Sequence, residues 1–135
     1  MKRLFRIVLV SIIMAVSFGL ISSCDNSTGV YGIDVVFPDS AVDFTSHVQP
    51  FLKKNCAYSG CHSSITMAGG LSMEDYFSIM TFPGLIIPEN PNSSILNQIL
   101  EGVLPHGTIF YSGYITQNQI QGMRTWVLEG AKLIP

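Results

Sequence analysis

Apolar side chains recur at helical spacing in four stretches after residue 41, and no stretch of useful length alternates apolar and polar residues. The stretches run from about residue 42 to 54, from 72 to 80, from 92 to 102 and from 116 to 130. This spacing places the apolar side chains on one face of a helix. The pattern therefore predicts an all-α domain of about four short helices with long loops between them.

Capping residues mark both ends of the last predicted helix. Thr116 is a favourable N-cap, and Gln119 three positions later completes a capping box. Gly130 is suited to the C-terminal stop. The apolar side chains between these ends form a single face, made of Ile120, Met123, Trp126 and Val127. This helix is therefore the best specified of the four.

The other predicted helices have weaker signals at their ends. Residues 72–75 resemble a capping box, and either Asn92 or Ser93 is expected to cap the third helix. Pro50 lies inside the first stretch, where a proline removes a backbone hydrogen bond and clashes with the preceding turn. The first helix is therefore expected either to begin near Pro50 or to be kinked there.

The N-terminal segment has the pattern of an export signal. Three basic residues, Lys2, Arg3 and Arg6, precede a mostly apolar run from residue 7 to residue 21. About 15 apolar residues are too few to span a bilayer, which takes about 20. The pattern therefore predicts a cleaved signal peptide instead of a membrane-spanning helix.

The apolar run ends in a lipobox-like sequence, Ile21-Ser22-Ser23-Cys24. This resemblance implies a lipoprotein signal peptide over residues 1–23 and a lipid attached to Cys24. A cysteine with two or three acyl chains anchors a protein stably to a membrane. Residues 24–41 contain many turn formers and show little periodicity, with room for a short extended piece at Ile33 to Phe37, so we expect a tether there and a domain from 42 to 135.

The charge of the chain after the predicted cleavage excludes one class of partner. Four Lys and Arg residues then stand against nine Asp and Glu residues, a formal charge of −5. Nucleic acids are bound mainly through cationic side chains. A nucleic-acid partner is therefore not expected.

The residues best suited to bind a cofactor or a metal are Cys56, Cys61 and His62, in the segment CAYSGCH. The shorter form C-x-x-C-H is the attachment motif of a c-type haem, and here the spacer has four residues. Two alternatives remain open. A Cys56–Cys61 disulfide is common chemistry in an exported protein, and zinc bound by these three residues with His106 is a further hypothesis.

The order of motifs from about residue 42 to residue 131 resembles a small class I-like cytochrome c domain of the bacterial exported and lipid-anchored kind, including the planctomycete type. The matching residues, in chain order, are His47 to Leu52, Cys61 with His62, Gly69 to Leu71, Pro88, Asn90 with Pro91, Ser94, and Trp126 to Ala131. The resemblance implies a cytochrome c-like bundle around a covalent haem c, held by Cys56, Cys61 and His62. It also implies that Phe44, Phe51 and Trp126 lie where the first and last helices cross.

The sequence departs from this family at the sixth iron ligand. Relatives carry a Met-Pro pair before the last helix, and this chain has Leu104-Pro105 instead. Because leucine cannot coordinate iron, His106 becomes the leading candidate. Three methionines, Met67, Met73 and Met80, are further candidates, and an open position is the other alternative.

The resemblance implies a single-electron carrier in the cell envelope, lipid-anchored through Cys24 and facing the periplasm or the exterior. Its partners would be redox proteins and the membrane lipid. No catalytic dyad or phosphate-binding glycine pattern is found in the sequence, so we expect an electron carrier more than an enzyme. The alternative is a haem-free binding or scaffold lipoprotein with a Cys56–Cys61 disulfide.

Overall fold

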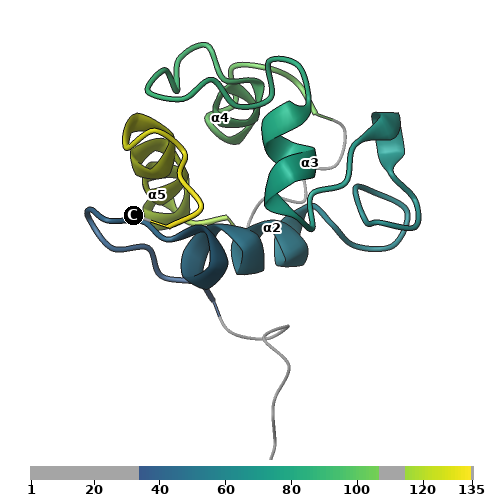
Figure 1. The fold of residues 1–135 in the computed structure, drawn as a ribbon, viewed down its shortest axis with the longest axis horizontal. Coiled ribbons are helices and arrows are strands. Elements are labelled where there is room, and N and C mark those ends of the chain that lie inside the picture. Colours follow the sequence, from purple (N-terminus) through teal and green to yellow (C-terminus); the bar gives the residue numbers. More distant parts are fainter. Residues whose placement is uncertain (1–33, 107–114, 135) are drawn as a thin grey trace, which may run out of the picture.

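The computed structural model describes residues 34–106 and 115–134. Within these ranges the chain is helical and has no β-strand (Figure 1). The α-helices are α2 (Gln49–Asn55), α3 (Tyr76–Thr81), α4 (Ile95–Leu100) and α5 (Gln117–Leu128), with a π-helical turn η2 (Phe44–Val48) before α2 and a 3-10 turn η3 (Ala68–Gly70). The predicted all-α class with four short helices is confirmed. None of the helices in these ranges is long and apolar enough to cross a membrane.

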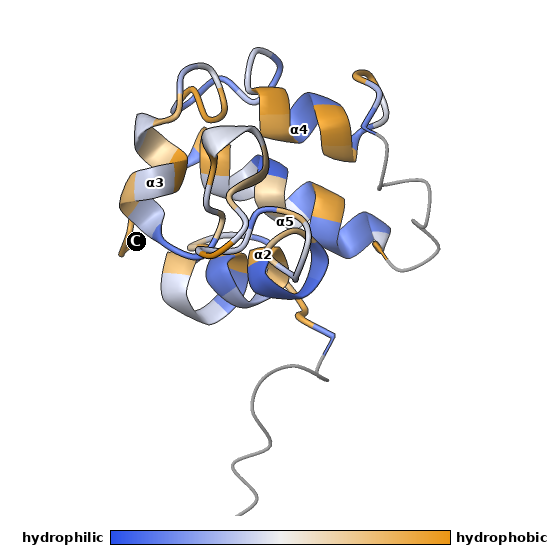
Figure 2. Ribbon diagram, turned by 90° about the vertical axis from the view of Figure 1, so that its right-hand side faces the viewer, coloured by the Kyte–Doolittle hydropathy of each residue, from blue (hydrophilic) through white to orange (hydrophobic). Residues whose placement is uncertain are grey.

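The helices surround one core. Helix α2 lies along one side of the domain and α4 closes the opposite side, with α3 and α5 between them (Figure 1). Apolar and polar residues alternate in bands along α4 and α5, as expected for amphipathic helices (Figure 2). The apolar bands contribute to a continuous buried cluster that also includes residues of η2 and α2.

The first helical segment accommodates Pro50 by beginning a new helix beside it. Asp43 caps η2, because its Oδ1 accepts a hydrogen bond of 2.6 Å from the backbone N–H of Ser46. The backbone N–H of Asp43 in turn donates to Nδ1 of His47 at 3.0 Å. Pro50 then falls in the first turn of α2, where a missing N–H costs no intrahelical bond. The expectation that the helix begins near Pro50 is confirmed.

Aromatic side chains join the first and last helical segments. The ring of Phe44 lies 5.8 Å from that of Trp126 and packs edge-on against Tyr76 at 5.2 Å. Trp126 is fully buried, and its Nε1 donates to the carbonyl of Lys132 at 2.9 Å. Phe51 is buried as well, with its ring edge-on to that of Phe37 at 5.7 Å. Phe44 and Trp126 therefore meet as predicted, while Phe51 packs on a residue that was assigned to the tether.

The segment before residue 42 is folded onto α5. The Asn118 side chain bonds both backbone groups of Phe37, accepting from its N–H at 2.8 Å and donating to its carbonyl at 2.9 Å. Gln119 donates to the carbonyl of Val35 at 3.1 Å. The carboxylate of Glu129 accepts from the N–H groups of residues 41 and 42 at 2.7 and 2.9 Å. Residues 35–41, at the end of the predicted tether (24–41), thus pack on the domain.

Asn118 gives a direct test of this docking. Asn118→Ala leaves both backbone groups of Phe37 without their partner, and we expect the free energy of unfolding to fall by about 1–3 kcal/mol. Urea unfolding followed by circular dichroism measures the change. Gln121→Ala, an exposed position of the same helix, is the control and should change stability by less than about 0.5 kcal/mol. Equal stabilities for the two variants would contradict the assigned role.

The helix caps confirm one prediction and correct two. The capping box of Thr116 and Gln119 is present in full. The box predicted over residues 72–75 does not form, because Asp75 is itself the N-cap of α3 and accepts from the N–H of Ser78. The N-cap of α4 is Ser94, so the prediction of Asn92 or Ser93 was wrong. The Ser94 hydroxyl is used elsewhere: it accepts from the N–H of Ile87 and donates to a carbonyl in the preceding loop.

Candidate functional site

The CAYSGCH segment forms a closed bulge at the end of α2. Cys56 is the C-cap residue of α2, and its N–H donates to the carbonyl of Leu52 at 2.8 Å. Its own carbonyl accepts from the N–H of His62 at 3.1 Å, so the two ends of the motif are joined by a backbone hydrogen bond. Gly60 has φ +88°, a conformation that side chains disfavour and that lets the spacer turn back. The four-residue spacer therefore forms a loop, and the residues at the two ends of the motif, Cys56 and His62, lie next to each other.

Backbone hydrogen bonds on the far side of the motif hold Cys61 and His62 in place. The carbonyl of Cys61 accepts from the N–H of Ala68 at 3.0 Å, and the carbonyl of His62 accepts from that of Met73 at 2.8 Å. The N–H of Ser64 donates a hydrogen bond to the carboxylate of Glu74. Two separate segments after the motif thus fix the backbone from which the imidazole projects.

Both cysteines of the motif are free thiols in the structure. Part of Cys56 reaches the surface, but its thiol is enclosed. Burial, and to a smaller extent the charge of the neighbouring Cys61, raise the pKa of this thiol from 9.0 to about 12. Cys56 is therefore a neutral thiol at physiological pH, and little of it is present as the nucleophilic thiolate.

The raised pKa predicts how the haem-free chain responds to pH. Alkylation of Cys56 by iodoacetamide should be slow at pH 8 and about 100-fold faster at pH 10, because each pH unit below the pKa changes the thiolate fraction about tenfold. Peptide mass spectrometry after timed alkylation gives the rate for this residue. In urea the same residue should react much faster at pH 8, and equal rates in the folded and unfolded chain would contradict the prediction.

The same shift has a consequence for stability. The folded state binds the Cys56 proton more tightly than the unfolded state, since its pKa is raised. The resulting stabilisation is fully present below about pH 9 and is lost as the pH rises towards 12.

The structure brings His106 to His62 from across the domain. The centres of the two imidazole rings are 5.9 Å apart, and the ring planes are inclined by 44°. Both residues are half-buried. Nδ1 of His62 is itself buried and has no hydrogen-bond partner, which leaves it available to a bound group.

The distance between the rings suits a shared metal ion. A metal–nitrogen bond is about 2 Å long and a ring centre lies about 1 Å behind its nitrogen, so two imidazoles on opposite sides of one ion have centres about 6 Å apart. The observed 5.9 Å agrees with this value. This separation is also within the range of ordinary contacts between two rings, so it is compatible with a shared metal ion without requiring one.

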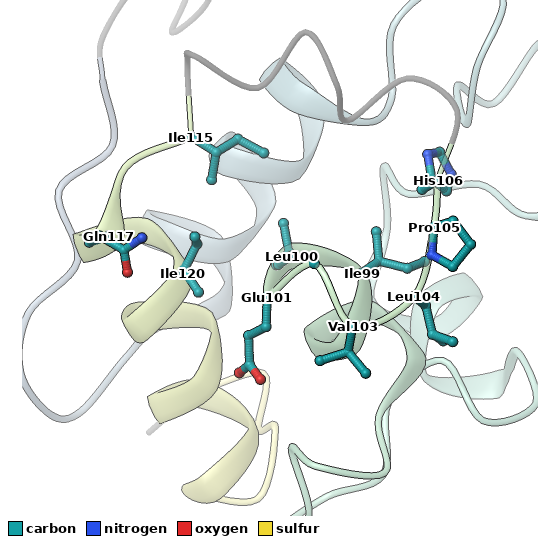
Figure 3. Close-up of a pocket in the computed structure, with 11 residues that line it drawn as sticks. Ile99, Leu100, Glu101, Val103, Leu104, Pro105, His106, Ile115, Gln117 and Ile120 are labelled. Carbon is teal, nitrogen blue, oxygen red and sulfur yellow. The ribbon is translucent and has the colours of Figure 1, made fainter.

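A hollow of about 600 Å³ opens beside His106 (Figure 3). Most of its walls are apolar, as is usual for cofactor pockets, which measure about 300–1,000 Å³. Its described lining comes from the end of α4, the loop that follows and the start of α5, namely Ile99, Leu100, Glu101, Gly102, Val103, Leu104, Pro105, His106, Ile115, Gln117 and Ile120. The sequence did not single out these apolar residues as a site, although they flank the loop that carries His106.

No protein-family model, no curated protein and no solved structure matches this chain. A function is therefore inferred from the motif, the approach of the two imidazoles and the hollow beside His106.

The three methionine candidates lie in different surroundings. Met67 is exposed and has a left-handed backbone, whereas Met73 is buried in the core and Met80 is packed against it. Unlike His106, none of them lines the hollow in the described ranges. Among the candidates for the sixth ligand, His106 is thus the one with a matching position.

Two other predictions concern metals and lipid. In residues 34–106 and 115–134, no three His, Cys, Asp or Glu side chains are grouped as a metal site, so the four-ligand zinc set does not form there. Cys24 and the signal peptide 1–23 lie outside the described residues.

Proposed function

We propose that this chain is a membrane-anchored c-type cytochrome that carries single electrons through a covalently bound haem. The observation that carries the proposal is the approach of His106 to His62, with ring centres 5.9 Å apart. His62 directly follows the second of two free thiols in a C-x4-C-H motif. A haem in this position would supply a one-electron couple at its iron.

Each site residue has a separate task in this proposal. Cys56 and Cys61 would hold the porphyrin through thioether bonds, and the adjacent His62 would bind the iron. His106 would be the second iron ligand, in the place where the cytochrome c domains that the sequence resembles use a methionine. Two imidazoles give a lower reduction potential than an imidazole with a thioether, because the thioether favours the reduced metal.

The surroundings of the site also support an electron carrier. Leucine and isoleucine side chains of α4 and α5 line the hollow beside His106, and they would exclude water from the part of a porphyrin that reached it, which would tune the potential. Cys56, Cys61 and His62 are not among the residues that line this hollow. With both histidines bound to the iron, no position would remain for a substrate there. Lipid on Cys24 would keep the domain at the membrane of the cell envelope, near redox partner proteins.

Covalent haem is the property to test first. The full chain is expressed in a periplasm with active cytochrome c maturation, and a denaturing gel is stained for haem. A stained band at the mass of the chain supports the proposal. An unstained band overturns it, and a mass lower by two protons would then identify the haem-free lipoprotein with a Cys56–Cys61 disulfide.

The distal ligand is tested by His106→Ala. Loss of a nitrogen ligand converts a six-coordinate low-spin haem into one with an open or water-bound position, so we expect the oxidised spectrum to become high-spin. His47→Gln is the control, because His47 hydrogen-bonds the backbone of Asp43 and packs on Phe37. Identical low-spin spectra for the parent and His106→Ala would exclude His106 as the ligand.

A further inference from the structure

Arg124 of α5 holds α4 at both of its ends. Its Nη1 bonds Oε1 of Glu101, the C-cap residue of α4, at 2.7 Å. Its Nη2 bonds the side-chain oxygen of Asn92, which precedes α4. The planar guanidinium thus binds one partner on each side of the helix with a single rigid group.

The loop that carries His106 is fastened to the same helix. The N–H groups of Val103 and Leu104 both donate to the carbonyl of Gln98, at 2.8 and 3.1 Å. Pro105 follows with its backbone φ restricted by the ring, and His106 comes next. The loop that leads to His106 is therefore hydrogen-bonded to α4 as far as Leu104. We expect a displacement of α4 to be passed on to the imidazole two residues later.

The Arg124–Glu101 ion pair joins α5 to the end of α4, where it can restrain α4 and the loop after it. Glu101 is one of the residues lining the hollow, and its carboxylate lies between α4 and α5 (Figure 3). The side chains of Arg124 and Glu101 are only 29% and 27% exposed, so water screens the pair less than it screens a fully exposed one. Because α4 has only six residues, a contact that spans both its ends restrains the whole helix.

We infer that Arg124 is a positioning residue that holds His106 in its axial position on the iron. The inference rests on the proposed function, since it concerns a ligand of the haem. Without the two hydrogen bonds of the Arg124 guanidinium, α4 and its loop can shift more easily relative to α5. A larger fraction of molecules then has His106 detached from the iron. An external ligand binds that fraction, so its apparent affinity rises in proportion.

Carbon monoxide is the probe, because it is neutral and binds reduced iron at a position that His106 vacates. Arg124→Met keeps most of the apolar part of the side chain and removes the guanidinium with its two hydrogen bonds. We expect the affinity of the reduced, haem-loaded protein for carbon monoxide to rise about three- to tenfold. Lys54→Met is the matched control: it removes the ion pair with Asp34, in a part of the chain that does not line the hollow, and should leave the affinity unchanged.

Glu101→Gln separates positioning from a simple effect of charge. This substitution changes the net charge in the direction opposite to Arg124→Met, yet both remove the ion pair. A positioning role predicts that both variants bind carbon monoxide more tightly. Shifts of opposite sign, or affinities equal to that of Lys54→Met, would overturn the inference.

The parent protein distinguishes a failure of this inference from a failure of the proposed function. If the parent carries no haem, the proposed function falls. If the parent carries haem and His106→Ala raises the carbon monoxide affinity, unchanged binding in Arg124→Met refutes the positioning role alone. Urea unfolding of Arg124→Met and Lys54→Met shows whether their stabilities match, and a rise in affinity at matched stability supports the role of Arg124.

Discussion

Replacing Cys61 by serine is expected to abolish covalent haem attachment. The proposed attachment requires a thiol directly before the iron ligand, and Cys61 and His62 provide this adjacency. The backbone of both residues is held by hydrogen bonds from Ala68 and Met73, so the two residues keep a fixed relation to each other. Serine has a similar size but a hydroxyl group that forms no thioether. Haem staining of a denaturing gel and the mass of the intact chain measure the result.

Two comparisons make this result specific to the thiol. Ser59→Ala alters an exposed residue of the same bulge and should leave the staining unchanged. Cys56→Ser should weaken the staining without eliminating it, because Cys61 and His62 remain adjacent. Full staining of Cys61→Ser would show that the segment is not the attachment site.

The second large effect is expected for Gly122→Ala, which should lower the free energy of unfolding by about 3 kcal/mol. A β-carbon at this position would lie 2.1–2.3 Å from three atoms of Phe37, far inside contact distance. Phe37 cannot easily withdraw, because Asn118 holds its backbone from both sides and its ring packs on Phe51. The clash therefore opposes the docking of the N-terminal segment on α5. Denaturant unfolding of the haem-free chain measures the loss.

A double substitution shows whether Phe37 is the cause. Phe37→Ala alone removes a buried ring and should also destabilise the domain. In the double variant the new methyl group meets no ring, so the combined loss should be smaller than the sum of the single losses. Additive losses would place the effect of Gly122→Ala elsewhere in the helix.

The sequence predicts best those features that depend on neighbouring residues. The capping box of Thr116 and Gln119 and the start of an α-helix beside Pro50 both involve contacts within one turn of helix, and the structure has both. Ser94 shows the limit of this approach. Its hydroxyl bonds the loop around Ile87 and leaves the helix end without a side-chain cap, and no local pattern indicates that choice.

Contacts between distant segments could not be predicted in the same way. The sequence named His62 and His106 as candidate ligands from their neighbours, but their approach to 5.9 Å depends on how α4 packs on α5. The roles of Asn118 and Gly122 were missed for a related reason. Both act on Phe37, 81 and 85 positions away, which looks like a tether residue in the sequence.

The docking of residues 35–42 on α5 also determines the order in which the domain can form. Phe37 is joined to Asn118 across 81 positions, and Ala41 to Glu129 across 88. Contacts of such long range form late, because the chain between them must first be closed into a loop. During synthesis, the fold cannot be completed until residues 117–129 have emerged. The CAYSGCH segment is made before them, so under the proposed function its thiols would be accessible to an attachment machinery while the chain is still open.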